Sequence, residues 1–433
     1  MIAALRMPTL LHPDDHAFHR MVAAFEGQPE PWGKVNRALR DAVVSYAAER
    51  SPYYRSVIRP GTAFEDVPIL TKEVIRERYD DLIAEGVHRD RWARDATSGS
   101  LGPPVAFLRD TAQGFLENVS GLRFLRWMEG IPPDATRVWI RSGHPERPRR
   151  SRRGARGRED YALRTQDLTP DLLARESRVW ARFPSYYIYG HASIIGWIAE
   201  QVERGHVELR RQPLAIVTTA DTLTDHGARQ VSRILSAPVH SWYGGREVNG
   251  YVAGTLPGTR RYAFNPLLVY PEVVDGAGRP VPPAETGRLV LTDLNNLVMP
   301  FLRYDMGDVA IPSAEGSVGG FPLMDHLVGR EIEVIRFPSG RVLNGVTLGR
   351  VLFVDHNLGE DILWYQCAKT RENAVELRVV WAPSAGEDSA VAAARAVRTL
   401  ADPDTDVRVR TVTELERLPS GKVWILRDES SPG

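Results

Sequence analysis

Apolar side chains recur three and four positions apart in two windows of the first ninety residues, 14–25 and 35–48. This spacing aligns them along one face of a helix, so both windows are predicted to be amphipathic helices. Ser51-Pro52 follows the second window, and a proline at that place ends a helix. The first part of the chain is therefore expected to consist of helices joined by turns.

From about residue 138 the pattern changes to short apolar runs that alternate with amphipathic windows. The runs predict strands at 137–141, 214–219 and 239–243, and the windows predict helices at 171–182 and 225–235. Strands that alternate with helices in this way favour a parallel sheet with helices packed on it. The fold class expected for the chain is therefore α/β.

After Pro266 the helical windows disappear, and the runs at 267–274, 287–292 and 300–311 are separated by glycine, proline and asparagine. These runs predict a β-rich subdomain on the main body. A boundary is expected near Gly329-Arg330, because the chain beyond it has a strand and helix pattern of its own. The elements expected there are helices from Thr347 and Asp388 and strands at Ile362, Val375 and Val407. The predicted organisation is a large N-terminal α/β domain over residues 1–329 and a small, mobile α+β domain over residues 330–433.

Composition narrows the classes of protein to which the chain can belong. Its 433 residues are 43% apolar and 25% charged, as is typical of globular proteins, and the length allows two or three domains. The 55 basic residues balance the 55 acidic ones, so no overall field attracts nucleic acid or a membrane surface. No apolar run reaches the ~18 residues of a membrane span, and no secretion signal opens the chain. Neither nucleic acid nor a membrane is therefore expected as a partner.

Cys367 is the single cysteine, which excludes an intramolecular disulfide and a zinc site of several thiolates. A cytoplasmic location is therefore expected. Residues 147–158 contain seven arginines, and a block of like charges is typical of a solvated loop. The alternative is that these arginines dock a phosphate-bearing partner, such as coenzyme A or a carrier protein.

The segment from Asp95 to Val105 collects hydroxyl side chains and glycines in a short loop ahead of an apolar run. Backbone N–H groups that glycine leaves unshielded, with Ser and Thr hydroxyls beside them, commonly hold a phosphate group. No lysine follows the last glycine, so the loop is not a Walker motif. The segment predicts either a phosphate-binding loop or an ordinary tight turn.

Four further motifs follow this loop along the chain. They are Tyr243-Gly244-Gly245-Arg246-Glu247, Arg303-Tyr304-Asp305-Met306-Gly307-Asp308, Gly329-Arg330 and Leu418-Pro419-Ser420-Gly421-Lys422. In this order and at these intervals, the set resembles the adenylate-forming acyl-CoA ligase superfamily. Ser51-Pro52-Tyr53-Tyr54 and Met299-Pro300-Phe301 are similar to the phenylacetate-CoA ligase-like branch, including its capsule-biosynthesis ligase-like members. The resemblance covers roughly residues 45–425.

The resemblance implies roles for individual residues of these motifs. Glu247 is expected to bind Mg²⁺, and Asp308 to accept both ribose hydroxyls, with Arg330 approaching the same ribose. The ring of Tyr243, which Gly244 follows, is expected to lie beside adenine. The loop is expected to close over the β- and γ-phosphates of ATP through Thr97, Ser98, Gly99, Ser100 and Gly102.

Lys422 matches the C-terminal lysine of the superfamily, which bridges the substrate carboxylate and the α-phosphate. A carboxylate repels a polyphosphate, so a cation is needed where negative charge builds on the α-phosphate. Lysine occupies only four positions of the chain, Lys34, Lys72, Lys369 and Lys422. This scarcity favours a functional role for Lys422 over that of a surface lysine in a frayed tail.

Three positions depart from the superfamily pattern. The loop has Leu101 and Pro103 where a threonine and a lysine are usual, and Ile332 stands where an aspartate usually follows the boundary arginine. The first change removes one hydroxyl contact to phosphate. The last weakens the expectation that the C-terminal domain rotates between half-reactions. Residues 249–256 contain no cysteine or histidine, so no zinc is expected.

Residues 186–193 align with the substrate-lining strand and helix start of the family, and Ala220 and Asp221 align with a later lining turn. Tyr187, Tyr189 and His191 are expected to form a flat slot with polar edges, suited to an aromatic acid with hydroxyl or amino groups. An aromatic core cluster with a hydrogen-bonded histidine is the alternative.

The function expected is that of an acid–thiol ligase, which uses ATP and Mg²⁺ to activate an aryl carboxylic acid as an acyl-adenylate and then transfers the acyl group to coenzyme A. One alternative is an enzyme of secondary metabolism that passes the acyl group to an amine, a hydroxyl or a carrier protein. Another, from a different class, is a catalytically weak nucleotide-binding protein, which Leu101 and Pro103 suggest. The joint presence of four motif residues argues against the last: Glu247, Asp308, Arg330 and Lys422.

Overall fold

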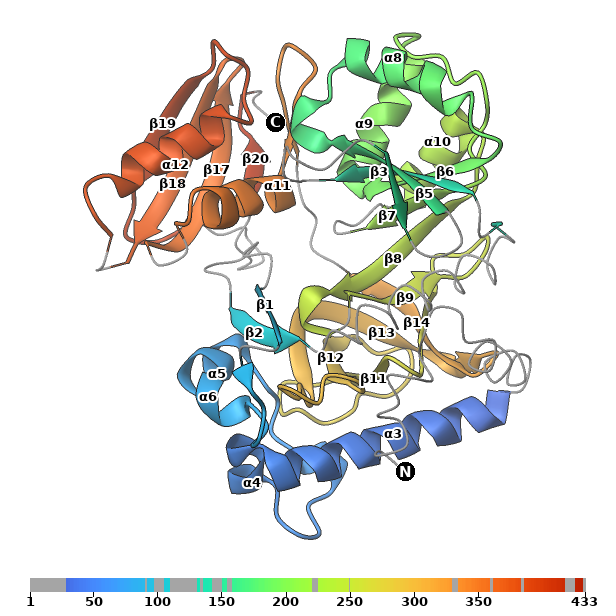
Figure 1. Cartoon of the computed structure of the whole chain (residues 1–433), viewed down its shortest axis with the longest axis vertical. Coiled ribbons are helices and arrows are strands. Elements are labelled where there is room, and N and C mark those ends of the chain that lie inside the picture. The colour runs from blue at the N-terminus through green and yellow to red at the C-terminus, as the bar shows by residue number, and fades with distance from the viewer. Residues whose placement is uncertain are drawn as a thin grey trace. The chain divides into compact units, whose positions relative to one another are not determined.

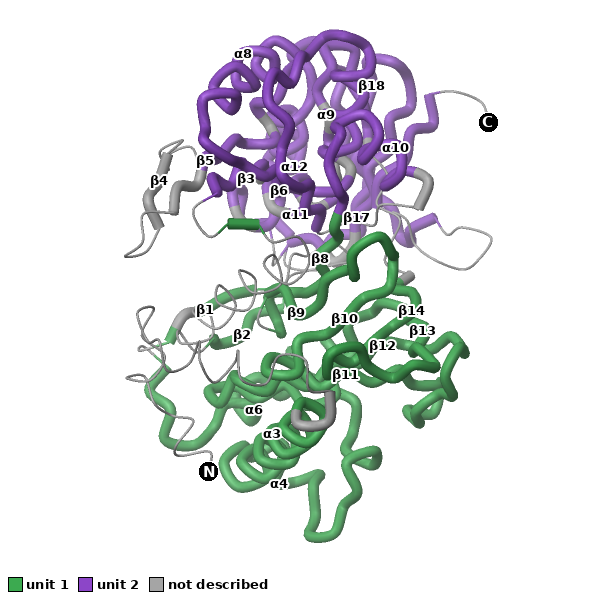
Figure 2. The backbone as a smooth tube through the Cα atoms, turned by 90° about the vertical axis from the view of Figure 1, so that its right-hand side faces the viewer, with its two compact units in different colours: residues 1–97, 105–133, 240–329 green, residues 98–104, 134–239, 330–433 purple. Residues whose placement is uncertain are grey.

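The computed structural model divides the chain into two compact units (Figure 2). Unit 1 combines residues 1–97, 105–133 and 240–329, and unit 2 combines residues 98–104, 134–239 and 330–433. Both units therefore join segments that are far apart in the sequence. The residues described are 29–89, 92–96, 105–109, 131–132, 135–141, 150–153, 158–219, 225–248, 250–328, 334–358, 361–382, 385–416 and 425–430.

Unit 1 contains an antiparallel sheet in the order β11-β12-β13-β14-β10-β9-β8 (Figure 1). The strands are β8 (Val239–Gly245), β9 (Gly250–Thr255), β10 (Tyr262–Phe264), β11 (Val269–Val274), β12 (Gly287–Asp293), β13 (Tyr304–Val318) and β14 (Phe321–Val328). The β-rich region expected after Pro266 is confirmed. The strand expected from Pro300 begins instead at Tyr304, because Pro300 has no N–H and Leu302 donates its N–H to the hydroxyl of Tyr54 at 3.0 Å.

A long helix, α3 (Pro29–Arg50), packs against this sheet and lies alongside β11 (Figure 1). It contains the helix predicted over 35–48, whereas the window 14–25 lies outside the described residues. The buried Asn36 side chain donates to the carbonyls of Pro266 and Val269 at 2.8 and 3.0 Å. Gly320 has φ +81° and approaches Trp32 so closely that a Cβ would lie 2.5 Å from the Trp32 side chain. The helix is thus fixed to the sheet by specific contacts.

Three short helices follow, α4 (Pro52–Val57), α5 (Lys72–Glu77) and α6 (Tyr79–Leu82). Ser51 does more than end α3, because its hydroxyl caps α4 by accepting the Tyr54 N–H at 3.5 Å. The buried Tyr54 hydroxyl donates to the Pro300 carbonyl at 3.1 Å while it accepts from Leu302. Burial raises the pKa of this phenol. The Ser51-Pro52-Tyr53-Tyr54 motif therefore connects the N-terminal helices to the segment that leads into β13.

Arg303 forms the buried polar centre of unit 1. Its side chain is 2% exposed and pairs with Glu272 at 3.1 Å. The guanidinium also donates to the carbonyls of Glu65, Val67 and Gly278. Burial raises the pKa of the Glu272 carboxyl, and the positive charge of Arg303 opposes that effect. One arginine therefore connects three other segments of unit 1 to the start of β13.

Unit 2 contains the predicted parallel sheet, in the order β7-β6-β3-β5. Its strands are β3 (Thr136–Arg141), β5 (Arg158–Arg164), β6 (Tyr186–His191) and β7 (Ile216–Thr219), and its helices are α8 (Pro170–Trp180), α9 (Ala192–Glu203) and α10 (Asp225–Leu235). The helices pack their apolar faces on one side of the sheet (Figure 1). The strands and helices predicted between residues 137 and 235 are confirmed. No helix in the described ranges is both long and apolar enough to cross a membrane.

The arginine-rich segment contains a strand, although a solvated loop was expected. β4 (Arg150–Arg153) pairs antiparallel with β5, with Arg150 opposite Tyr161 and Arg153 opposite Arg158. Repulsion among the like charges of the segment predicts a loop, but it takes no account of pairing with another strand. Pairing with β5 supplies backbone hydrogen bonds to β4 whatever side chains it carries, and Arg152 stands in register with Glu159.

The C-terminal part has a core of its own, formed by residues between Ile335 and Leu426. Its elements are β15 (Val334–Arg336), β16 (Val342–Asn344), α11 (Gly345–Arg350), α12 (Ser389–Arg398) and the sheet β19 (Asp406–Thr411), β18 (Ala374–Trp381), β17 (Ile362–Arg371) and β20 (Leu426–Asp428). Cys367 lies in this core, where burial raises the pKa of its thiol to about 12. The chain is therefore mixed α/β, as expected, while the domain division at 329/330 stays a prediction.

Replacing Arg303 with methionine should lower the free energy of unfolding by about 3–5 kcal/mol, because Glu272 would remain buried without its cation. The deficit should shrink as pH falls from 8 to 5. Without Arg303 the folded-state pKa of Glu272 rises further above its unfolded value, so protonation in acid favours the folded state. Urea denaturation of the variant and the wild type at both pH values measures the difference in their free energies of unfolding.

Arg261→Gln is the control, since its pair with Glu315 is exposed and should contribute less than about 1 kcal/mol. The double variant Arg303→Met with Glu272→Leu should recover part of the loss. Equal unfolding free energies for Arg303→Met and Arg261→Gln would contradict the central role of Arg303.

Candidate nucleotide and acyl site

Glu247 lies in the short 3₁₀ turn Arg246–Val248 that follows β8. The hydroxyl of Tyr304, the first residue of β13, donates to its Oε1 atom at 3.4 Å. Its Oε2 atom lies against Gly245, where an added Cβ would be only 2.8 Å away. The absence of a side chain at Gly245 therefore gives the carboxylate its place between the end of β8 and the start of β13.

Tyr243 and Asp308 come from two different motifs and meet in unit 1. The Tyr243 hydroxyl donates to Oδ2 of Asp308 at 2.8 Å. The ring of Tyr243 packs against Phe264 and Tyr262, with ring centroids 6.1 and 6.5 Å away. An aromatic ring on β8 and a carboxylate on β13 are thereby held side by side.

Asp305 supports the turn that carries Asp308. Its Oδ1 atom accepts the N–H of Gly307, which has φ +72°, and its Oδ2 atom accepts from Arg288 at 2.7 Å. A left-handed residue at position 307 is needed for this turn, and glycine adopts that conformation without steric cost. Asp305 and Gly307 are therefore structural members of the motif that ends in Asp308.

Gly244 is required by the close approach of β8 and β9. The register of these strands shifts between Tyr243 and Gly244, and a Cβ on Gly244 would lie 1.6 Å from the Gly250 carbonyl oxygen. No side chain fits in that space. The role that the structure supports for Gly244 is thus to bring Tyr243 and Glu247 to their places on either side of it.

Asp95 is a residue whose contribution the sequence did not reveal. Its two carboxylate oxygens accept from Arg246 at 3.0 Å and from Arg109 at 2.9 Å. Asp95 and Arg109 belong to the antiparallel pair β1 (Ala93–Ala96) and β2 (Ala106–Arg109). In the sequence, the one indication of this role was the position of Asp95 directly before the hydroxyl- and glycine-rich loop. These contacts connect β1 and β2, the strands before and after this loop in the sequence, to Arg246, which precedes Glu247.

In unit 2 the predicted acyl-site residues share one face of the sheet. Tyr187 and Tyr189 alternate with Tyr186 and Ile188, which pack into the helical core, so they face the opposite side. Tyr187 and Tyr189 are each 2% exposed. His191 is half-buried at the N-terminal end of α9. These three side chains therefore lie on the face of the sheet opposite the helices.

The same face of β3 adds two residues that the sequence analysis did not consider. Trp139 lies beside Tyr189, with ring centroids 6.1 Å apart. The guanidinium of Arg137 lies 4.7 Å from the Trp139 ring and 5.5 Å from the Tyr189 ring. Their signal was only alternation within a predicted strand, and the parallel pairing of β3 with β6 brings them to the tyrosines. The aromatic face therefore carries a cation.

The other predicted site residues lie outside the described part of the chain. They are Thr97, Ser98, Gly99, Ser100, Gly102, Ala220, Asp221, Arg330 and Lys422. The departures Leu101, Pro103 and Ile332 lie there as well. Roles for these residues stay predictions.

Glu247 is the residue expected to bind Mg²⁺. Within the described residues, no group of three or more His, Cys, Asp or Glu side chains could hold a metal ion. Mg²⁺ is commonly held by one or two carboxylates together with substrate phosphates and water. A single carboxylate such as Glu247 fits a Mg²⁺ ion that arrives with ATP.

Comparison with known proteins gives two kinds of match, although no protein-family model matches the chain. It is similar to protein CapK of Staphylococcus aureus, with 20% identity over 278 residues, 61% of this chain and 59% of CapK. It thus spans less than two thirds of CapK. Among solved structures, it is similar to 2-hydroxyisobutyryl-CoA ligase in complex with 2-HIB-AMP and CoA, with a TM-score of 0.62 and 19% identity over 94% of this chain and 92% of that one. The same ligase in its postadenylation state gives a TM-score of 0.58 over 93% of this chain and 91% of that one.

These matches confirm the resemblance that the motifs indicate. The chain has the fold of the adenylate-forming acyl-CoA ligases, and its similarity to CapK agrees with the capsule-biosynthesis ligase-like branch. At 19–20% identity the likeness establishes architecture. What the chain does must be argued from its own residues.

Gly244→Ala should lower the free energy of unfolding by at least about 3 kcal/mol, because the new methyl group must push β9 away from β8. The control is Gly276→Ala, in the same unit, where an added Cβ meets nothing within 4 Å. Urea denaturation compares the two variants. Comparable midpoints would show that the approach of Gly244 to Gly250 is not as tight as described.

Proposed function

We propose that the chain is an acid–thiol ligase that uses ATP to convert a carboxylic acid into an acyl-adenylate and then transfers the acyl group to coenzyme A. The observation that carries this proposal is the meeting of two distant motifs in unit 1. Tyr243 binds Asp308 at 2.8 Å, and Tyr304 binds Glu247 at 3.4 Å. These two contacts pair two tyrosines with two carboxylates, in a chain that has the fold of the adenylate-forming ligases.

The two half-reactions define what the residues must do. A carboxylate oxygen of the acid attacks the α-phosphorus of ATP, and the bond to pyrophosphate breaks. The thiolate of coenzyme A then attacks the acyl carbonyl, and AMP leaves. The first step brings together two anions, so a cation must be held where charge builds up. We assign this part to Lys422.

Tyr243, Glu247 and Asp308 of unit 1 are assigned to the nucleotide. In this assignment Asp308 accepts the ribose hydroxyls and the Tyr243 ring contacts adenine. Arg330 is assigned to the same ribose, and the loop from Thr97 to Gly102 is assigned to the terminal phosphates. Glu247 would hold Mg²⁺, which when bound would supply positive charge to the phosphate oxygens. The Tyr304 hydroxyl orients the Glu247 carboxylate by its hydrogen bond.

The acid is assigned to the face formed by Tyr187, Tyr189 and His191, and Ala220 and Asp221 are assigned to the acid as well. Trp139 and Arg137 extend this face, and its flat aromatic rings favour a planar aryl acid over a flexible chain. The polar atoms of the tyrosines and His191 favour ring substituents that form hydrogen bonds.

Transfer of the acyl group to an amine, a hydroxyl or a carrier protein is the second candidate. The observation that favours it is Ile332, since the usual aspartate at this position belongs to the segment about which the C-terminal domain rotates for thioester formation. The two candidates share the adenylation step and differ in the acceptor.

Pyrophosphate exchange across a panel of aryl and alkyl acids, with and without coenzyme A, tests the proposal. We expect exchange with a hydroxy- or aminobenzoate at a kcat/KM at least tenfold above that with hexanoate or decanoate, and consumption of coenzyme A. Exchange without thioester formation would favour the second candidate. A preference for fatty acids would overturn the aryl assignment, and no exchange with any acid would leave a nucleotide-binding protein.

Lys422→Ala should reduce the adenylation rate by roughly 10²–10³, because a single preorganised cation at a developing charge contributes about that much. Lys34→Ala, on the exposed side of α3, is the control and should keep the wild-type rate. Stopped-assay measurement of the AMP-forming step compares them. A wild-type rate in Lys422→Ala would remove this lysine from the reaction.

Asp308→Asn and Glu247→Gln should separate the two carboxylate roles. Asp308→Asn should raise the KM for ATP, because a carboxylate accepts from two hydroxyls better than an amide does. Glu247→Gln should raise the Mg²⁺ concentration needed for half-maximal rate. Glu315→Gln, an exposed carboxylate of the same unit, is the control. Normal ATP and Mg²⁺ dependence in both test variants would place the nucleotide elsewhere.

A further inference from the structure

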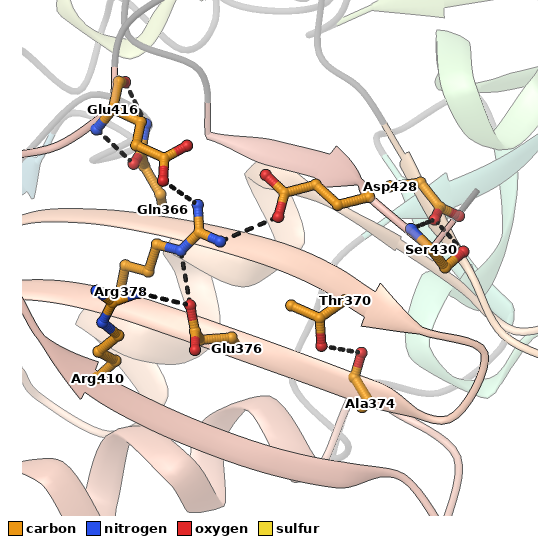
Figure 3. A network of polar contacts seen from close by, with 10 residues as sticks. Gln366, Thr370, Ala374, Glu376, Arg378, Arg410, Glu416, Asp428 and Ser430 are labelled. Carbon is orange, nitrogen blue, oxygen red and sulfur yellow. Dashed lines mark hydrogen bonds and ion pairs between the residues drawn. The ribbon is translucent and has the colours of Figure 1, made fainter. Parts of the chain in front are cut away.

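Arg378 of β18 is the centre of a group of carboxylates in the C-terminal part of unit 2 (Figure 3). Its side chain is only 9% exposed, and it contacts three glutamates. Nε donates to Glu376 at 2.7 Å, Nη2 donates to Glu429 at 3.0 Å, and Nη1 pairs with Glu416 at 3.1 Å. One planar guanidinium thus connects three points of the chain.

Two of these points have a special place in the sequence. Glu416 is the last described residue before the segment 417–424. Glu429 follows β20, which begins at Leu426, two positions after that segment. Lys422 belongs to the segment itself. Arg378 therefore contacts the chain on both sides of the segment that contains Lys422.

Gln366 of β17 holds the first of these points by its backbone (Figure 3). Its side-chain amide donates to the Glu416 carbonyl at 2.7 Å, and its oxygen accepts the Glu416 N–H at 3.0 Å. The amide thus reproduces the pair of hydrogen bonds that a neighbouring strand would make. Gln366 is fully buried. The backbone at Glu416 is therefore fixed in position and orientation.

The second point is fixed by β20. This strand pairs parallel with β17, and Cys367 donates its N–H to the Ile425 carbonyl at 2.8 Å. Beyond the strand, the Glu429 N–H donates to the Lys369 carbonyl at 2.8 Å. Both ends of the eight-residue segment are thus bound to the same pair of strands, and Arg378 connects the two ends directly.

A buried cation among three carboxylates is a poor way to gain stability, because the desolvation of the charges offsets much of their attraction. What the rigid fork of an arginine provides is geometry, since it holds several carboxylates at fixed angles. A lysine that acts on reacting atoms must be carried by a backbone that is fixed in position. A misplacement of about 1 Å at the reacting atoms can cost roughly 10²-fold in rate.

We propose that Arg378, together with Gln366, is a positioning residue for adenylation: it fixes the two ends of the segment that presents Lys422 to the α-phosphate. This inference rests on the proposed function for its catalytic part. Its structural part, the anchoring of residues 416 and 425–430, does not depend on that function.

Hydrogen–deuterium exchange of the full chain tests the anchoring first. Arg378→Met and Gln366→Leu should each raise the exchange rate of the peptide over residues 412–430 at least tenfold, while peptides from α3 stay unchanged. Arg410→Met is the matched control, because Arg410 pairs with Glu376 from the neighbouring strand at 3.7 Å and is 61% exposed. Wild-type exchange in both test variants, or equal effects in the control, would overturn the anchoring.

A double-variant cycle in pyrophosphate exchange tests the positioning. Arg378→Met should lower kcat between ten- and a hundredfold, with the KM for ATP within twofold of the wild type. In the Lys422→Ala background the same substitution should have no further effect, because Arg378 acts through Lys422. A full further loss in that background would overturn the positioning role.

Gln366→Leu keeps every charge in place, so it repeats the cycle even where Arg378→Met lowers the yield of folded protein. If the wild-type chain shows no pyrophosphate exchange with any of the acids, the proposed function and the catalytic part of this inference are both overturned. The deuterium exchange would still decide whether Arg378 and Gln366 anchor the segment.

Discussion

The buried guanidinium of Arg303 is the constraint on which unit 1 depends. It is 2% exposed, and it binds one carboxylate and three backbone carbonyls. Its own backbone has φ +50°, a conformation that a non-glycine residue keeps only when its surroundings hold it there. The next residue is Tyr304, and Asp308 follows on the same strand. The side chains assigned to the nucleotide therefore start from a backbone that a buried ion pair fixes.

The same device recurs where the chain has to join distant segments. Arg246 and Arg109 meet on Asp95 beside the loop assigned to phosphate, and Arg378 joins three glutamates beside the segment of Lys422. Arginine suits this purpose because its planar fork donates in several fixed directions, whereas an ammonium group acts as a point charge. In a chain with only four lysines, nearly all cations are of the kind that fixes geometry.

The motifs divide into residues that build the site and residues assigned to its chemistry. Ser51, Tyr54 and Gly244 act through caps, buried hydrogen bonds and the close approach of two strands. Glu247 and Asp308 are each half-buried and hydrogen-bonded to a tyrosine hydroxyl. Motif similarity alone does not distinguish the two kinds, because both are required for the same arrangement. Burial and contacts separate them.

The sequence by itself determined the local elements and indicated the resemblance to the adenylate-forming acyl-CoA ligases. The helix over 225–235 and the strand from Gly287 follow from periodicity, which depends on neighbours within a few positions. Tertiary structure decided what depends on pairing between distant segments: the strand at Arg150–Arg153, the late start of β13, and the approach of Arg137 to Tyr189. A strand's partner, register and buried contacts are set by residues far away in the chain, and no local pattern of side chains contains that information.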